Sequence, residues 1–181
     1  MKFKKISDSQ IKFTQLMLPS HSNFSGKIHG GFILQLMDQV AFACASKHSG
    51  EYCVTASVNK VDFLNPIEVG ELVTFSASVN YTGRTSMLVG LRVESENIKT
   101  GVKKHCNSSY FTMVAKNEEG ENVEVPGLIL EDVESVRRFA RTISRKYQSK
   151  KRDMRFSSEG FELDLHIEEV RKGNAKIEIP S

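Results

Sequence analysis

A glycine pair followed by a lone acid is the part of this sequence best suited to chemistry. His29, Gly30 and Gly31 precede an apolar stretch, and Asp38 follows two helical turns later. The first N–H groups of a helix have no partner within it, and glycine lets another molecule's oxygen approach them closely. Amides in this position could polarise a docked carbonyl oxygen, as an oxyanion hole does.

The acid lies on a segment with the pattern of a buried helix. From Phe32 to Lys47, apolar residues cover most of the helical circumference, and Asp38 falls in one narrow polar arc. The other members of that arc are Gln35, Gln39 and Ser46. A carboxylate that faces the protein interior is costly unless it is paired or used. Two interpretations stay open: a structural acid bridged to an arginine or a backbone amide, or a functional group.

The distance between the glycines and the acid matters for either interpretation. At about 1.5 Å per residue, Asp38 begins about 10–12 Å along the helix axis from the glycine pair. That is too far for a contact within one helix. The acid could therefore serve a second position on a substrate, or a position formed with another subunit.

These residues resemble the signature of the hot-dog-fold acyl-CoA thioesterases. The matching positions are Asn23, Gly26, His29, Gly30, Gly31 and Asp38. The resemblance is strongest to the cytosolic acyl-CoA hydrolase branch, which includes the mammalian brain-type enzyme and bacterial short-chain thioesterases. It covers roughly Ile11 to Pro126. Further matches follow in family order at Val54–Val58, Asp62–Pro66, Val69–Glu71, Thr82–Ser86, Ser95–Asn97 and Phe111–Thr112.

The resemblance implies an α+β protein with the hot-dog fold, a long central helix wrapped by an antiparallel sheet. The implied reaction is hydrolysis of a fatty acyl-CoA to free acid and coenzyme A. Asp38 would act as general base on water, with direct nucleophilic attack as the alternative. Asn23 would orient the water or the carbonyl, and the amides of Gly30 and Gly31 would polarise the carbonyl.

In the family, the asparagine and the acid come from opposite subunits across a two-fold axis. A homodimer is therefore the expected minimal active unit, with a trimer of dimers as the expected assembly. The acyl-CoA substrate would also contact His29, Arg84, Thr85 and Ser86. Alternatives stay open for three positions: Asn23 as a loop or capping residue, His29 as a brace for the helix start, and Arg84 as a solvated turn residue.

Two other functions compete with thioester hydrolysis. Enoyl-CoA hydratases on this fold use an Asp-x-x-x-x-His order, whereas His29 here precedes Asp38 by nine residues. A non-catalytic acyl-CoA-binding regulator would normally lack the acid or carry a DNA-binding segment, and no helix-turn-helix is expected before Ile11. Release of free coenzyme A thiol separates the first function from both others.

The chain is predicted to form one thioesterase domain over residues 8–126 and an extension over residues 127–181. Strands are expected at Ile11–Leu18, Tyr52–Leu64, Leu72–Tyr81, Ser86–Ile98 and Lys103–Val114, and Gly50 is expected to end the central helix. The predicted extension comprises a helix over Glu131–Gln148, a basic linker and a small β-hairpin between Phe161 and Ile179.

Composition bears on the location of the protein and on the ligands it could bind. No apolar run reaches membrane-spanning length, and the N-terminus lacks a secretory pattern, so a cytoplasmic protein is expected. The three cysteines are expected to be reduced and buried, and neither a metal site nor a cofactor is predicted, because coenzyme A belongs to the substrate. Between Arg137 and Arg155, nine basic residues face one acid. A solvated helix face or attraction of coenzyme A phosphates explains them, and no nucleic acid is expected.

Overall fold

The computed structural model describes residues 2–155 and residue 170. The chain divides into two compact units, Met1–Thr142 and Ile143–Ser181. The first unit holds every predicted catalytic and substrate-binding residue. The predicted hairpin between Phe161 and Ile179 lies outside the described residues, and the predicted domain limits of 8–126 and 127–181 stay a prediction.

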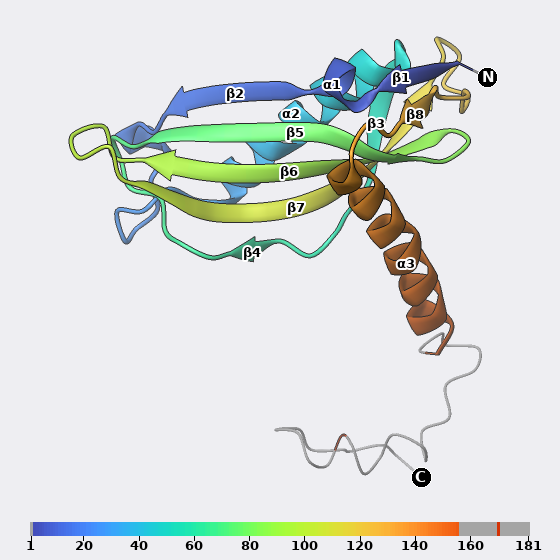
Figure 1. Ribbon diagram of the computed structural model, residues 1–181. Helices are drawn as coiled ribbons and strands as arrows, with labels where there is room; N and C mark the ends of the chain where they lie inside the picture. Colours follow the sequence, from blue (N-terminus) through green and yellow to red (C-terminus); the bar gives the residue numbers. More distant parts are fainter. Residues whose placement is uncertain (1, 156–169, 171–181) are drawn as a thin grey trace. The chain divides into compact units, whose positions relative to one another are not determined.

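An antiparallel six-stranded sheet forms the body of the first unit (Figure 1). Its strands pair in the order β2-β5-β6-β7-β3, and β4 pairs with β7 beside β3. Their bounds are β2 Ile11–Leu16, β3 Tyr52–Val58, β4 Asp62–Phe63, β5 Leu72–Thr82, β6 Ser86–Glu96 and β7 Lys103–Lys116. On β5, Val73, Phe75 and Ala77 are buried while Thr74 and Ser76 are partly exposed, but Ser78 and Asn80 farther along the strand are buried as well.

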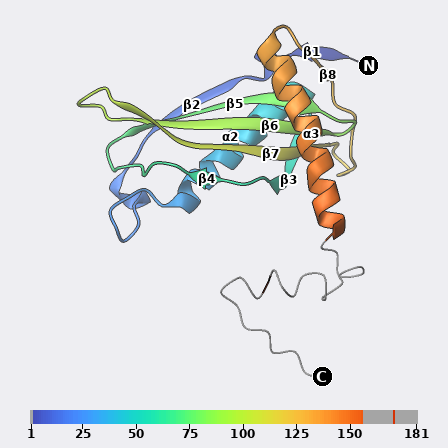
Figure 2. The ribbon, with the colours of Figure 1, turned by 60° about the horizontal axis from the view of Figure 1, so that its bottom comes forward.

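The long helix α2, Gly30–Ser49, crosses one face of this sheet (Figure 2). Its buried side includes Ile33, Met37 and Ala41, which join the core with inner-face residues such as Phe75 and Phe111. The helix ends at Gly50, whose φ of 82° is in the left-handed region that favours glycine. The predicted C-cap and the predicted arrangement of helix and sheet are both confirmed.

One side of α2 does not follow the prediction. Within a single chain Asp38 is exposed, and with it Gly31, Gln35 and Phe42. These positions recur at spacings of four, three and four residues, which places them on one side of a helix. The expectation of an inward-facing carboxylate was therefore wrong for the single chain. The apolar residues on this side, Phe42 above all, made the whole circumference look buried when it is not.

Smaller elements complete the first unit. They are β1 Phe3–Lys5, α1 Ile6–Ser9, the short 3-10 helix η1 Pro19–His21 and β8 Gly127–Ile129. β1 and β8 pair in parallel, a contact between chain segments far apart in sequence that no local pattern predicts. The predicted helix after Pro126 is confirmed as α3, Val133–Arg155.

The start of α3 contributes to the first unit. The ring of Phe139 lies 5.0 Å, centroid to centroid, from that of Tyr81 on β5. On its exposed side, Glu134 pairs with Arg137 and Arg138, so this part of the basic stretch is a solvated helix face. None of the helices in the described part of the chain combines the length and the apolarity needed to cross a membrane.

The three cysteines are free and buried, as predicted. Burial raises the pKa of the Cys44 thiol to about 12, so its reactive thiolate is scarce near neutral pH. We expect a thiol-specific disulfide reagent to label none of the three within minutes in native protein and all three after denaturation. A rapidly labelled equivalent in the native protein would contradict this burial. The measurement also tells whether thiol-release assays need correction for the enzyme's own cysteines.

Candidate functional site

His29 caps the start of α2 with its side chain. Its Nδ1 accepts a hydrogen bond from the Gly31 N–H at 3.0 Å, and its own backbone N–H donates to the His21 carbonyl at 2.9 Å. An imidazole nitrogen that accepts carries no proton, so the neutral ring has its proton on Nε2. The ring therefore braces the helix start and presents Nε2–H as a donor.

The two glycines have different environments. A Cβ on Gly31 would stand 3.1 Å from the His29 Nδ1, so the absence of a side chain lets the capping ring close over the helix. A Cβ on Gly30 would stand 3.1 Å from the ring of Phe63 on β4. Because the Gly31 N–H already donates to His29, the Gly30 N–H is the better placed of the two amides to donate to a ligand oxygen.

Asn23 organises the loop before α2. Its Oδ1 accepts hydrogen bonds from the Ser25 N–H at 3.0 Å, the Ser25 hydroxyl at 2.8 Å and the Lys27 N–H at 3.2 Å. Its backbone N–H donates to the Lys27 carbonyl at 2.7 Å, and Gly26 turns the loop with a φ of 76°. With Oδ1 committed to the loop, the Nδ2 hydrogens are the part of the side chain that can act on a substrate.

Asp38 has a partner that the sequence did not identify. The hydroxyl of Thr55 on β3 donates to Asp38 Oδ1 at 2.5 Å, a short bond of the kind made to charged acceptors. Asp38 is exposed in the single chain, and among the described residues no hydrogen bond is found to its second carboxylate oxygen, Oδ2. Thr55 lies within the Val54–Val58 segment that matches the family. Nothing in its residue type marks it, since only the packing of β3 beside α2 brings it to the acid.

The residues predicted to contact coenzyme A form the turn between β5 and β6. The Gly83 N–H donates to the Ser86 carbonyl at 2.7 Å and closes the turn. The carbonyls of Arg84 and Thr85 accept from Val125 at 3.0 Å and Ala115 at 3.1 Å, so the turn is fixed against the end of β7. The Arg84 side chain is exposed and available to a ligand.

The predicted site residues fall into two groups within one chain. Thr82 and Met87, which flank the turn, are paired across β5 and β6. In the neighbouring strands Met87 is paired with Met113 on β7, and Met113 with Thr55 on β3. Because Thr55 bonds to Asp38, the turn lies at the Asp38 end of the sheet. The loop with Asn23 lies toward the other end, beside the segment before β5 (Figures 1 and 2). One chain thus holds Asn23, His29, Gly30 and Gly31 in one group and Asp38, Thr55 and Arg84–Ser86 in the other.

The described residues hold no cluster of three or more histidine, cysteine or acidic side chains arranged to bind a metal ion. Cys44 and His48, four residues apart on α2, are both buried. The His48 Nε2 is hydrogen-bonded to the Pro126 carbonyl at 2.9 Å, and burial lowers the pKa of the ring. This histidine ties the end of α2 to the segment before β8.

Comparison with known proteins decides the family. The Thioesterase superfamily model matches residues 25–102. Protein VdlD of Helicobacter pylori is 41% identical over 138 residues, which are 76% of this chain and 79% of that protein. A solved structure of a hexameric apo acyl-CoA thioesterase is 36% identical with a TM-score of 0.81, covering 84% of this chain and 97% of that chain. The chain belongs to the thioesterase superfamily. The predicted family and hot-dog fold are confirmed.

Two further relatives bear on the site. The cytosolic acyl coenzyme A thioester hydrolase of Rattus norvegicus is 33% identical over 80% of this chain, which spans 39% of that longer protein. An acyl-CoA hydrolase of Staphylococcus aureus, solved with butyryl coenzyme A and coenzyme A, is 29% identical with a TM-score of 0.77, covering 93% of this chain and 99% of that chain.

The Staphylococcus aureus enzyme has also been solved as alanine variants of an asparagine, an aspartate and a threonine. In that enzyme the aspartate follows the asparagine by 15 residues, and the threonine follows the aspartate by 17. Asn23, Asp38 and Thr55 have the same two spacings here. The threonine that sequence reasoning missed thus stands at the position of a residue chosen for substitution in a relative.

Replacing Thr55 with valine should lower thioester hydrolysis. The change removes the hydroxyl that holds Asp38 while keeping the shape, and a hydrogen bond to a charged group is worth about 1.5–3 kcal/mol, or about tenfold to a hundredfold in rate. Thr55 is exposed in the single chain, so the melting temperature should change little. Thr55→Ser, which keeps the hydroxyl, is the matched control. Equal turnover in the valine and serine variants would show that the hydroxyl does not assist the acid.

Proposed function

We propose that this protein hydrolyses acyl-CoA thioesters to free acid and coenzyme A in active sites that two chains build together. The chain is an enzyme, an acyl-CoA thioesterase, as its sequence predicted. That assignment leaves no support for a hot-dog hydratase or a non-catalytic regulator. The observation that carries the rest of the proposal is the separation of Asn23 and Asp38 within one chain, each held in place by its own hydrogen bonds.

The first group of residues would receive the thioester carbonyl. The Gly30 N–H and the Asn23 Nδ2 are the donors that the resting fold leaves for an oxyanion. Gly31 would serve the site through its missing side chain, which admits the His29 ring. His29 would then donate from Nε2 to the substrate. In this proposal Asn23 acts on the carbonyl rather than on the water, because its only acceptor atom is already in use.

The second group would activate water. With Oδ1 held by Thr55, Asp38 would accept a proton through Oδ2 from a water that attacks the carbonyl carbon. Collapse of the tetrahedral intermediate breaks the carbon–sulfur bond, and the departing coenzyme A thiolate takes up a proton. The products are the free acid and coenzyme A. No cofactor takes part in this scheme, because the substrate itself brings the coenzyme A.

A homodimer would join the two groups. β3 is an edge strand with exposed apolar side chains, Tyr52, Val54 and Val58, and Phe42 of α2 lies 5.3 Å from Tyr52 between ring centroids. An exposed apolar edge of this kind favours pairing with a second chain. Two-fold symmetry sets the Asp38 end of one chain against the Asn23 end of its partner. The hexameric relative supports a trimer of dimers as the full assembly.

We place the protein in the cytoplasm. The support is the set of free buried thiols and the cytosolic relative from Rattus norvegicus. The turn of Arg84, Thr85 and Ser86 would bind the coenzyme A moiety at the Asp38 end of the site. The exposed Arg84 guanidinium suits a phosphate, to which it can donate two parallel hydrogen bonds.

Mixed dimers test the two-chain site. Asn23→Ala and Asp38→Asn should each remove most free-thiol release from acyl-CoA, because each lacks one essential group in both sites. An equal mixture of the two chains should recover up to about a quarter of wild-type activity, since half of the dimers are mixed and each contains one intact site. Differential tags would show that the dimers are mixed. If such dimers recover no activity, then either both residues act in a site within one chain, or one of them does not belong to the site.

Arg84→Ala should raise KM for acyl-CoA more than it lowers kcat. A group that grips the distant nucleotide contributes similar binding in the ground and transition states, and such binding is seen in KM. The effect should shrink with acyl-pantetheine substrates, which lack the nucleotide. Arg92→Ala, on the exposed Arg92–Glu94 pair of β6, is the control and should leave KM unchanged. Equal effects of Arg84→Ala on both substrates would rule out a nucleotide contact.

A further inference from the structure

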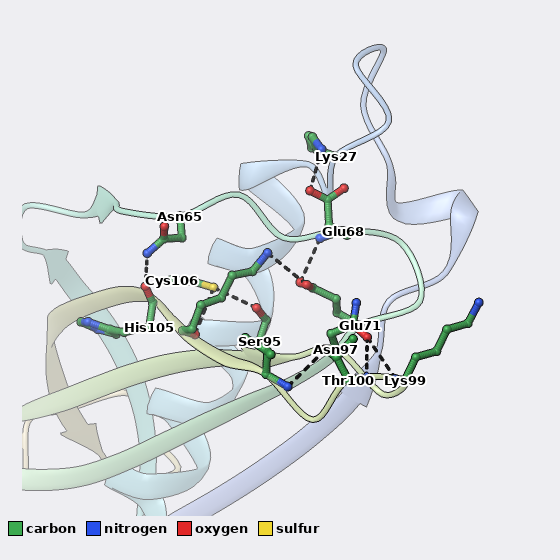
Figure 3. Close-up of polar contacts among 12 residues, drawn as sticks. Lys27, Asn65, Glu68, Glu71, Ser95, Asn97, Lys99, Thr100, His105 and Cys106 are labelled. Carbon is green, nitrogen blue, oxygen red and sulfur yellow. Dashed lines mark hydrogen bonds and ion pairs between the residues drawn. The ribbon is translucent and has the colours of Figure 1, made fainter.

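A buried ion pair lies outside the proposed site. Glu71, just before β5, has a side chain that is 6% exposed, and its Oε1 lies 3.0 Å from Lys104 Nζ on β7. Its Oε2 accepts the Glu68 N–H at 3.1 Å (Figure 3). Burial would raise the pKa of Glu71, but hydrogen bonds from Glu68, Lys104 and Ser95 outweigh it and hold the pKa below its usual value. A charged carboxylate is thus kept in the interior, where it is costly unless fully paired.

The contacts of this carboxylate continue to the loop before α2. The Glu71 carboxylate accepts from the Glu68 backbone N–H. The Glu68 side chain in turn forms an ion pair, with its Oε1 2.6 Å from Lys27 Nζ. The backbone of Lys27 in turn holds Asn23 twice, by donating to Oδ1 at 3.2 Å and by accepting from the Asn23 N–H at 2.7 Å. Lys104, Glu71, Glu68, Lys27 and Asn23 therefore form one continuous series of polar contacts, of which Figure 3 shows the part from Glu71 to Lys27.

The turn that carries Glu68 is also held by backbone hydrogen bonds. At one end the Ile67 carbonyl accepts the Ile28 N–H at 2.9 Å. At the other end Met17 bonds to the Gly70 N–H at 2.8 Å and to the Glu71 carbonyl at 2.9 Å. The Glu68 amide lies between these anchors, and the Glu71 carboxylate is its hydrogen-bond acceptor. The Glu68 carbonyl also accepts the Glu71 N–H at 3.3 Å, so losing the carboxylate would loosen the part of the turn that faces Lys27 without detaching it.

Packing does little to hold the tip of the Asn23 loop. Phe24 is wholly exposed, and Asn23, Ser25 and Gly26 are exposed as well. Within the described residues, the loop meets the 67–68 segment through the Lys27–Glu68 ion pair, an antiparallel backbone bridge between the same two residues, and the Ile28–Ile67 hydrogen bond. Exposed loops with few packing contacts take their geometry from such polar anchors.

We propose that Glu71, through Glu68 and Lys27, is a positioning residue that sets the orientation of the Asn23 amide toward the thioester carbonyl. The proposal rests on the proposed function, in which Asn23 donates to that carbonyl. Glu71 itself touches no substrate. Its effect belongs in kcat, because a small displacement of a catalytic donor weakens the transition state more than the bound ground state.

A pair of double variants separates positioning from stability. Glu71→Met with Lys104→Met replaces the buried carboxylate and its partly exposed partner by apolar side chains of similar length, an exchange that is often neutral for the stability of a buried pair. It removes the acceptor for the Glu68 N–H. Glu71→Gln with Lys104→Met also removes the charges but keeps an amide oxygen as acceptor. We expect kcat to fall about tenfold in the first variant with KM unchanged, and to recover in the second.

Two further variants complete the set. Arg92→Met with Glu94→Met removes an exposed ion pair, a base and a glutamate, on β6 and should leave kcat unchanged. Lys27→Met breaks the series at the partly exposed Lys27–Glu68 pair without disturbing the core, so it reports on positioning even if the buried pair proves necessary for folding. Like Glu71→Met with Lys104→Met, it should lower kcat. Wild-type kcat in both Lys27→Met and the folded double variant would overturn the proposal.

An Asn23→Ala background tests the route and the proposed function separately. If Glu71 acts through Asn23, adding Glu71→Met with Lys104→Met to Asn23→Ala should cause no further loss of kcat. A full tenfold loss in that background would overturn the positioning role, while leaving the role of Asn23 intact. Wild-type activity of Asn23→Ala alone would instead refute the proposed function. Melting temperatures of all variants, measured together, show that the compared proteins are folded.

Discussion

The packing of α2 against the inner face of the sheet is the interaction on which the rest of the structure depends. Ile33, Met37 and Ala41 are almost fully buried there against residues of β5, β6 and β7. Burying a large apolar side chain is worth about 1.5–3 kcal/mol, so this single helix supplies a large share of the core. In the second half of α2 the buried side chains of Ala41 and Cys44 are small, which lets the sheet pack close to the helix.

This packing also fixes which side of α2 remains for chemistry. Once one side is buried, Gly31, Gln35 and Asp38 must lie on the side that a single chain leaves exposed, where Asp38 still reaches Thr55 on the edge strand β3. The helix start and the acid then lie on the same exposed side, about 10 Å apart at 1.5 Å per residue. An acid and an oxyanion site at this separation on one helix cannot meet on one reacting atom. In the proposed function each chain therefore contributes two half-sites, which two-fold symmetry would complete.

The proposed site residues share a pattern in their hydrogen bonds. Each one uses a polar atom to hold the fold and keeps another for the substrate. Asn23 anchors its loop with Oδ1 and retains Nδ2, His29 caps the helix with Nδ1 and retains Nε2, and Asp38 is held at Oδ1 and retains Oδ2. Groups fixed in this way need little reorganisation during reaction, which is how electrostatic catalysis is achieved. By contrast, exposed ion pairs such as Lys60–Asp62 contribute little to the stability of the folded protein.

The sequence by itself determined the features that depend on neighbours along the chain. Apolar spacing and Gly50 located α2, and strand-forming runs between turn residues located β5 and its neighbours. The spacing of Asn23, His29 and Asp38 identified the family, because such motifs consist of residues close together in the sequence. Tertiary structure decided the rest. The outward direction of Asp38, its bond to Thr55 and the pairing of Glu71 with Lys104 depend on strand register and helix packing. Such contacts join residues 17 and 33 positions apart in sequence, and no local pattern encodes them.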